Sequence, residues 1–84
     1  MMDNTYNGWS NYETWNVALV ISNTEELYFT AREFMTGFEG QNPYIAFISC
    51  MGYRSKSTLD GVVYIGHRLN FKELNEFMLE LKDE

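Results

Sequence analysis

Side chains that commonly perform catalysis are few in this chain and lie far apart. His67 is the single histidine and Cys50 the single cysteine. A general base needs a partner and a pocket, and a metal site needs several ligands at fixed spacing. His67 stands beside Arg68 in a segment that we expect to be a solvated loop, whereas Cys50 follows an apolar run and is expected to fill the core. The residues therefore predict no catalytic site, no bound metal and no cofactor.

The carboxylates near the C-terminus are arranged more regularly. On a helical wheel they lie roughly 120° from the apolar stripe of the same segment, and one carboxylate per turn recurs about every 5.4 Å. The row comprises Glu73, Glu76, Glu80 and Glu84. This spacing is close to that of successive phosphates along a nucleic-acid strand. The row is therefore either an ordinary solvated face or a phosphate mimic that occupies a basic channel in another protein. Lys72 and Lys82 flank it and would dilute its field.

The stretch NGWSNYETWNVAL, residues 7–19, places both tryptophans of the chain among asparagines. One interpretation is structural: Trp15, on the inner side of a helix, belongs to the core, and Trp9 is partly covered. The other is functional, because Trp and Tyr are enriched in interface hot spots. In that case Tyr6, Trp9 and Tyr12 form an exposed aromatic patch that meets a partner.

Composition and charge narrow the class of protein. Apolar side chains make up 45% of the 84 residues and charged ones 21%, which is typical of a globular protein. We expect one domain spanning residues 1–84, with residues 1–9 as an N-terminal arm. The net charge of −6 argues against direct nucleic-acid binding, which needs a basic footprint. The longest apolar run, VALVI, is too short to cross a bilayer, and no signal peptide is recognisable. A cytoplasmic protein without membrane contact is expected.

Four helix-start signals divide the chain. The predicted N-caps are Ser10, Asn23, Asn42 and Asn70. Glu13 completes a capping box with the first of them, and Glu73 stands in the same position after the last. Pro43 follows the third, at a helical position where its missing N–H costs nothing.

Apolar residues recur at helical spacing after the last three caps. The expected core residues are Leu27, Ala31, Phe34, Met35 and Phe38, then Tyr44, Phe47, Ile48 and Met51, and finally Phe71, Leu74, Phe77, Met78 and Leu81. Gly52 is a natural helix stop. Residues 17–21 are apolar all round and fit either a helix or a buried strand; the capping box before them favours a helix.

Between Gly52 and Leu69 the pattern changes. Asp60-Gly61 suits a type I′ hairpin turn between short strands at 56–59 and 62–65. The expected fold is therefore a mainly α domain of about four short helices, with a short β-hairpin before the last helix. Two strands alone are marginal, so the hairpin would lean on the helices.

The segment YNGWSNYETWNVAL, residues 6–19, resembles the N-terminal signature of a family of small, mostly uncharacterised proteins of phages, plasmids and their hosts. In that family NGW is followed by Thr or Ser and then by NYETWNVAL. Residues 60–81 are similar to the ending of some members, where DGV precedes a loop and a helix start. Val20 stands where many members have a further tryptophan. The resemblance implies a mobile-element context and no catalytic residues.

These observations lead to two hypotheses about function. The first is a non-enzymatic, phage-type accessory protein that binds and inhibits or modulates a host protein, such as a defence nuclease of the CRISPR or restriction type. Acidic phosphate mimicry would then be its means, and the partner would be a nucleic-acid-binding protein. The second is a structural or regulatory module of a mobile element that self-associates, for instance as a homodimer, because its core is too small for one chain. Steep weakening of partner binding by salt would favour the first.

Overall fold

The computed structural model describes residues 6–82, and these residues form the four helices that the sequence predicts. The helices are α1 (Tyr12–Asn23), α2 (Glu25–Gly37), α3 (Pro43–Met51) and α4 (Phe71–Lys82). The fold is mainly α, and residues 17–21 are helical. No helix within residues 6–82 has the length and apolar character needed to cross a membrane.

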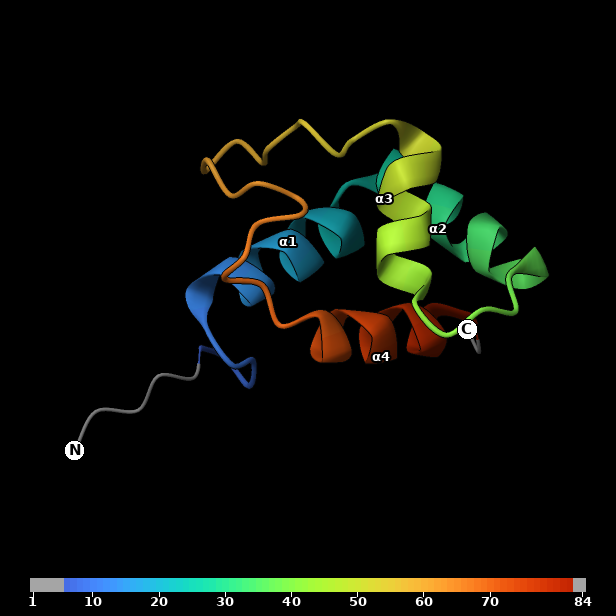
Figure 1. Ribbon diagram of the computed structural model, residues 1–84, viewed down its shortest axis with the longest axis horizontal. Helices are drawn as coiled ribbons and strands as arrows, with labels where there is room; N and C mark the ends of the chain where they lie inside the picture. The colour runs from blue at the N-terminus through green and yellow to red at the C-terminus, as the bar shows by residue number, and fades with distance from the viewer. Residues whose placement is uncertain (1–5, 83–84) are drawn as a thin grey trace.

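Helices α2 and α4 each contact all three of the other helices. Helix α4 runs below α1 and α3 in the view of Figure 1. The long segment after α3 arches over α1 and returns beside the start of α1 before α4 begins (Figure 1). As a result, the first turns of α1 and α4 lie side by side although they are far apart in the sequence.

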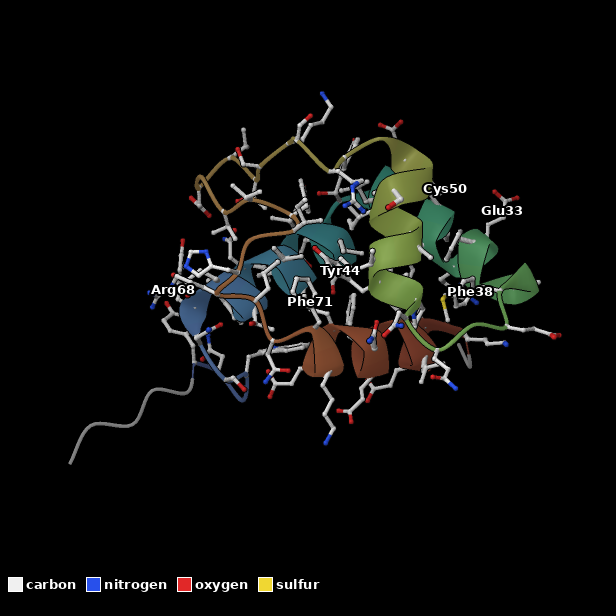
Figure 2. All side chains as sticks on the ribbon, in the orientation of Figure 1. Glu33, Phe38, Tyr44, Cys50, Arg68 and Phe71 are labelled. Carbon is white, nitrogen blue, oxygen red and sulfur yellow. The ribbon has the colours of Figure 1, made fainter. Side chains whose placement is uncertain are left out.

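The core is built from the apolar stripes predicted for α3 and α4. Tyr44, Phe47 and Ile48 of α3 are buried, as are Leu74, Met78 and Leu81 of α4. The ring of Tyr44 lies 6.0 Å from that of Phe71, and both are labelled in Figure 2. The Tyr44 hydroxyl donates to the Tyr64 carbonyl at 2.5 Å. In α2 the stripe is narrower than expected, with Ala31 and Met35 buried and Phe34 and Phe38 partly covered.

Two of the predicted N-caps are displaced by one residue. Helix α1 is capped by Asn11, whose side chain accepts from the Thr14 N–H, and not by Ser10. Helix α1 continues through Asn23, so Thr24 takes the N-cap position of α2 without a side-chain bond. The other two positions are confirmed, since Asn42 precedes α3 and the Asn70 side chain accepts from the Glu73 N–H.

The end of α3 follows the prediction for Gly52. This glycine is left-handed, with φ +74°. Its N–H donates to the Ser49 carbonyl, and the Tyr53 N–H donates to the Ile48 carbonyl. This pair of bonds is the Schellman arrangement, which satisfies carbonyls at the helix end.

The prediction that Trp15 belongs to the core is wrong. Helix α1 instead turns Thr14, Val17, Ala18 and Ile21 inward, together with Asn16, and Trp15 is only half-buried. The inward face is fixed by hydrogen bonds of its polar members, described below, which the apolar pattern does not reveal. Trp9 is partly covered and packs against the core, as expected. Cys50 is exposed near the end of α3 and does not fill the core.

The expected hairpin forms as a turn with little strand pairing. Within the described residues, 56–59 and 62–65 are joined by one isolated bridge, Ser57 to Val63, and by hydrogen bonds from the Thr58 N–H to the Val62 carbonyl and from the Tyr64 N–H to the Lys56 carbonyl. The Gly61 N–H donates to the Thr58 carbonyl, and Gly61 has φ +89°. Asp60 does not have the positive φ that a type I′ turn requires. The geometry matches a type I turn followed by a left-handed glycine, which also connects hairpin strands.

A type I′ pattern occurs elsewhere, at the turn before α1. Asn7 and Gly8 have φ of +50° and +90°. The backbones of Tyr6 and Trp9 are joined by two hydrogen bonds of 2.7 and 2.9 Å. Of the expected N-terminal arm, residues 1–5 lie outside the described part of the chain, while residues 6–9 form this tight turn.

Candidate functional site

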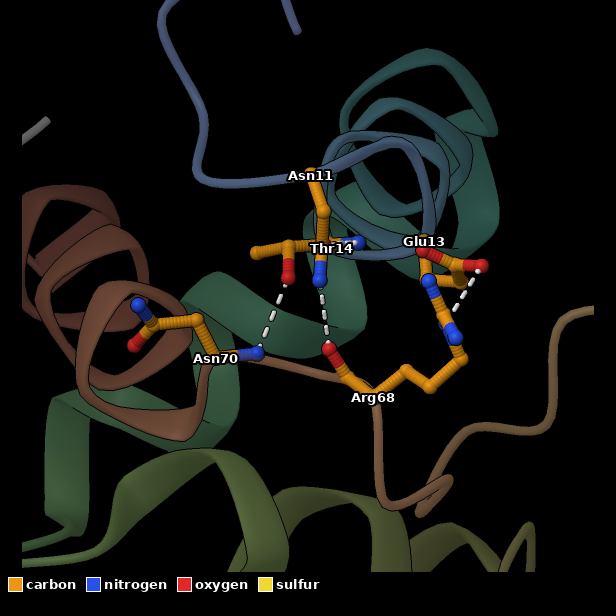
Figure 3. Close-up of polar contacts among 5 residues, drawn as sticks. All are labelled: Asn11, Glu13, Thr14, Arg68 and Asn70. Atoms are coloured by element: carbon orange, nitrogen blue, oxygen red, sulfur yellow. Dashed lines mark hydrogen bonds and ion pairs between the residues drawn. The ribbon is translucent and has the colours of Figure 1, made fainter. Parts of the chain in front are cut away.

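The first turns of α1 and α4 exchange capping groups (Figure 3). In an ordinary capping box the third helical residue accepts from the N-cap N–H of its own helix. Here Thr14, in the third position of α1, accepts from the N–H of Asn70 at 2.9 Å. Asn11, the cap of α1, donates its amide to the Arg68 carbonyl at 2.6 Å. Each helix start thereby stabilises the other.

Glu73 takes part in the same junction. It occupies the third position of α4, and its Oε1 accepts from the Ser10 N–H at 2.9 Å. The Asn70 side chain also donates to the Ser10 hydroxyl at 2.9 Å. Glu73 is therefore half-buried and holds the N-terminal segment against α4. Glu73 therefore has a structural role, which distinguishes it from Glu76 and Glu80 in the same carboxylate row.

Asn16 attaches α1 to the turn at 58–61. Its exposed fraction is 1%, and its amide donates to Oδ2 of Asp60 at 2.7 Å. Its carbonyl oxygen accepts from the hydroxyl of Thr58, also at 2.7 Å. The Thr58 hydroxyl in turn accepts from the Val62 N–H. The asparagines of the NYETWN stretch thus hold the second half of the chain in place.

An acidic hollow lies beside this junction. It has a volume of about 200 Å³ and is lined by Gly8, Trp9, Glu73, Glu76, Phe77 and Glu80. The rings of Trp9 and Phe77 meet edge to face at 5.9 Å. Glu76 and Glu80 are exposed, one helical turn apart. The structure thus joins Trp9 to the predicted carboxylate row. Glu84, the last member of that row, lies outside the described residues.

The aromatic cluster, defined as Tyr6, Tyr12 and Trp15, occupies a different surface. The ring of Tyr6 lies 4.5 Å from that of Trp15 and 5.4 Å from that of Tyr12. The rings of Tyr12 and Trp15 are 5.6 Å apart. Tyr6 and Tyr12 remain 40% and 38% exposed. The predicted patch of Tyr6, Trp9 and Tyr12 is thus divided, with Trp9 turned to Phe77 and Trp15 taking its place.

A cleft adjoins the aromatic cluster at Tyr12. Its volume is about 350 Å³, which is within the range of ligand sites. Most of its lining surface is apolar, and four of its lining residues are ionisable: Glu13, Asp60, His67 and Arg68. The lining residues are Tyr12, Glu13, Asp60, Gly61, Val62, Val63, Gly66, His67, Arg68 and Leu69. Partial desolvation, together with the negative charges of Asp60 and Glu13 and the neighbouring Tyr6, raises the pKa of Tyr12.

The ionisable groups of this cleft are engaged in different ways. Glu13 pairs with Arg68, Oε2 to Nε, at 3.0 Å, and Asp60 accepts from Asn16. His67 is exposed, as the sequence predicts. The described residues contain no group of three or more His, Cys, Asp or Glu placed to hold a metal ion. The cleft has the features of a binding surface: the aromatic ring of Tyr12, apolar lining residues and the carboxylate of Asp60, which Asn16 holds in place.

Two members of these surfaces were not singled out from the sequence. The helical pattern predicts a core position for Trp15, whereas the indole is half-buried. The Asp60-Gly61 pattern predicts Asp60 only as a turn residue. The position of Asp60 depends on Asn16, which reaches across to the turn. The polar residues Thr14 and Asn16 among the inward residues of α1 are the signal in the sequence that this helix binds other segments.

Comparison with curated proteins and with solved structures gave no match. A family model described as a family of unknown function, DUF7249, matches residues 2–84. With nearly the whole sequence matched, the chain belongs to the DUF7249 family.

Proposed function

We propose that the protein is a non-enzymatic accessory protein of a phage or another mobile element, and that it acts by binding a host protein. The partner is a protein with a basic, nucleic-acid-binding surface, such as a defence nuclease of the CRISPR or restriction type. Binding at the acidic hollow would inhibit that protein by occupying the place of nucleic acid. The observation that carries the proposal is the pair Glu76 and Glu80, exposed beside the rings of Trp9 and Phe77.

The chemistry of the hollow favours a cationic partner. Two carboxylates at about 5.4 Å spacing present charge at intervals similar to those of phosphates. The neighbouring rings supply contact area, as bases do next to phosphates. Lys82, which the sequence places beside the row, donates from Nζ to the Phe38 carbonyl at 3.2 Å. Its charge is thereby held against the Phe38 carbonyl at the C-terminal end of α4.

The net charge and the sequence resemblance also support the binding of a basic host protein. The net charge of −6 disfavours direct nucleic-acid binding and favours association with basic surfaces. The NYETWNVAL resemblance suggests a mobile-element origin, and the host cytoplasm is then the compartment of action. A non-enzymatic role agrees with the engagement of Glu13 and Asp60 in contacts with Arg68 and Asn16.

The test is affinity capture of host proteins from a bacterial lysate, followed by an assay of the captured protein for nucleic-acid binding. We expect the protein to compete with nucleic acid for its partner, with affinity falling steeply as salt rises. The double variant Glu76→Lys with Glu80→Lys should abolish capture while the chain remains folded, because both side chains are exposed.

The matched control is Glu33→Lys with Glu39→Lys. It changes the net charge equally at exposed positions, with Glu33 on α2 at the other end of the molecule (Figure 2). Capture should survive in this control. Equal loss in both double variants would show that only net charge matters, and unchanged capture by the Glu76 and Glu80 variant would refute the acidic hollow as the site.

A self-associating module is the second candidate, and two exposed apolar residues favour it. Phe29 on α2 is 53% exposed and Leu79 on α4 is 49% exposed. Pairing of copies through such residues would be insensitive to salt, unlike binding at the acidic hollow. Sedimentation of the wild type and of Phe29→Ser with Leu79→Ser decides the matter. A monomer at all concentrations would eliminate this candidate.

A further inference from the structure

We propose that the cleft beside Tyr12 is a binding site for an arginine side chain presented by a partner protein, with Tyr12 stacking on the guanidinium and Asp60 accepting its hydrogen bonds. This goes beyond the proposed function, because the site lies on a different surface from the acidic hollow and includes none of its residues.

The aromatic cluster supplies the stacking surface. Its three rings contact one another at 4.5 to 5.6 Å. Neither Tyr12 nor Trp15 belongs to the hydrophobic core or to the residues packed against it. Other residues of the NYETWN stretch have structural roles. Asn11 caps α1, Thr14 accepts a hydrogen bond from the residue before α4, and Asn16 bonds to the turn at 58–61. The rings of Tyr12 and Trp15 make no such bond to a distant segment.

Asp60 supplies the charge, and its position is fixed. One oxygen of its carboxylate is held by the buried amide of Asn16. Within residues 6–82, no lysine, arginine or histidine forms an ion pair with it. By contrast, Glu13 on the same cleft is neutralised by Arg68. The cleft therefore carries a net negative charge at Asp60, next to the ring of Tyr12, and that field also contributes to the raised pKa of the Tyr12 hydroxyl.

These features together fit a guanidinium better than an ammonium. A guanidinium is planar, stacks on aromatic faces and donates to a carboxylate in a fixed fork. An ammonium is a compact and strongly hydrated charge, and it would leave the apolar lining of Val62, Val63 and Leu69 in contact with its water shell. The volume of about 350 Å³ is enough for one side chain with its flanking backbone.

The test uses a peptide of one arginine flanked by glycines, acetylated and amidated, titrated into the full chain and followed by NMR. Its matched probe carries citrulline, which keeps the shape and removes the charge. We expect shifts at the Trp15 indole, the Tyr12 ring and the Asp60 amide with the arginine peptide, and none with the citrulline peptide. Absence of shifts at millimolar arginine peptide, or equal shifts with citrulline, would overturn the proposal.

Two variants locate the site. Asp60→Asn keeps an oxygen to accept from Asn16, so the fold is retained, but it removes the charge and should weaken binding about tenfold or more. Glu80→Gln removes one charge from the acidic hollow and should leave the affinity unchanged. Equal weakening by both would reduce the binding to general electrostatics and contradict the site. A lysine peptide that binds as tightly as the arginine peptide would contradict the guanidinium specifically. Neither result depends on the partner of the acidic hollow.

Discussion

At the scale of single residues, two buried polar side chains of α1 bond this helix to distant parts of the chain. Thr14 and Asn16 have exposed fractions of 0% and 1%, and each hydrogen-bonds a residue more than forty positions away. A buried polar group that loses its partner retains the full cost of its desolvation. The two side chains are therefore as sensitive to substitution as the apolar residues that surround them.

Asn16→Ala should lower the free energy of unfolding by about 2–3 kcal/mol. It removes both the acceptor of the Thr58 hydroxyl and the donor to Asp60. Denaturant unfolding followed by circular dichroism measures the change. Asn23→Ala, at the exposed end of the same helix, should stay within about 0.5 kcal/mol of the wild type. Similar values for the two variants would show that the buried network contributes little.

Trp15→Ala should cost only about 1–2 kcal/mol, because the indole contacts Tyr6 and Tyr12 outside the core. Met35→Ala, at a position with 0% exposure, should cost about 2–5 kcal/mol. Comparing the two midpoints of chemical unfolding tests this order. If Trp15→Ala is the more damaging of the two, the indole belongs to the core after all and the aromatic cluster is not a free surface.

At the scale of elements, the sequence was informative wherever local rules determine the outcome. Helix spacing predicted the stripes of α3 and α4, and Gly52 predicted the end of α3. The predictions that failed concern residues whose contacts are with partners far away in the sequence. Ser10 does not cap α1: its hydroxyl accepts from the distant Asn70 side chain, and Asn11 takes the cap position. The turn that contains Asp60 is bonded to Asn16 of α1. The composition of both candidate surfaces depends on these long-range bonds, so it could not be read from spacing.

Gly61→Val should destabilise the chain by about 1–2 kcal/mol, because φ is +89° at this position. A side chain there would meet nothing within 4 Å, so the cost is that of the backbone conformation and not of a clash. Gly37→Ala is the control: it also meets nothing within 4 Å, and its φ is not positive. That variant should be neutral or slightly stabilising in thermal unfolding. A tolerated Gly61→Val would mean that the turn rearranges freely.

At the scale of the whole molecule, stability should decline in alkaline solution. Burial, and secondarily the neighbouring Tyr64, raises the pKa of Tyr44 far above its ordinary value near 10, and burial likewise raises the pKa of Tyr64. The folded state holds these protons more tightly than the unfolded state does. Their contribution is therefore fully present below about pH 10 and is lost as the pH rises further.

Unfolding free energies measured between pH 8 and pH 11.5 check this slope. Tyr44→Phe should be about 1 kcal/mol less stable than the wild type at pH 8, because the bond to the Tyr64 carbonyl is lost. Its decline above pH 10 should be shallower, because one titrating hydroxyl is gone. Parallel curves for the two proteins would show that Tyr44 does not control alkaline unfolding.

The exchange of capping groups between α1 and α4 affects how the protein folds during its synthesis on the ribosome. Ser10 and Glu73 are separated by 63 positions, so the residue that precedes the cap of α1 has no acceptor for its N–H until α4 has emerged. Contacts between such distant positions form late, because the intervening chain must first be ordered. While synthesis proceeds, α1 therefore exposes Val17 and Ile21 to chaperones and proteases. We therefore expect the contacts between α1 and α4 to form together once α4 is available, and not progressively from α1.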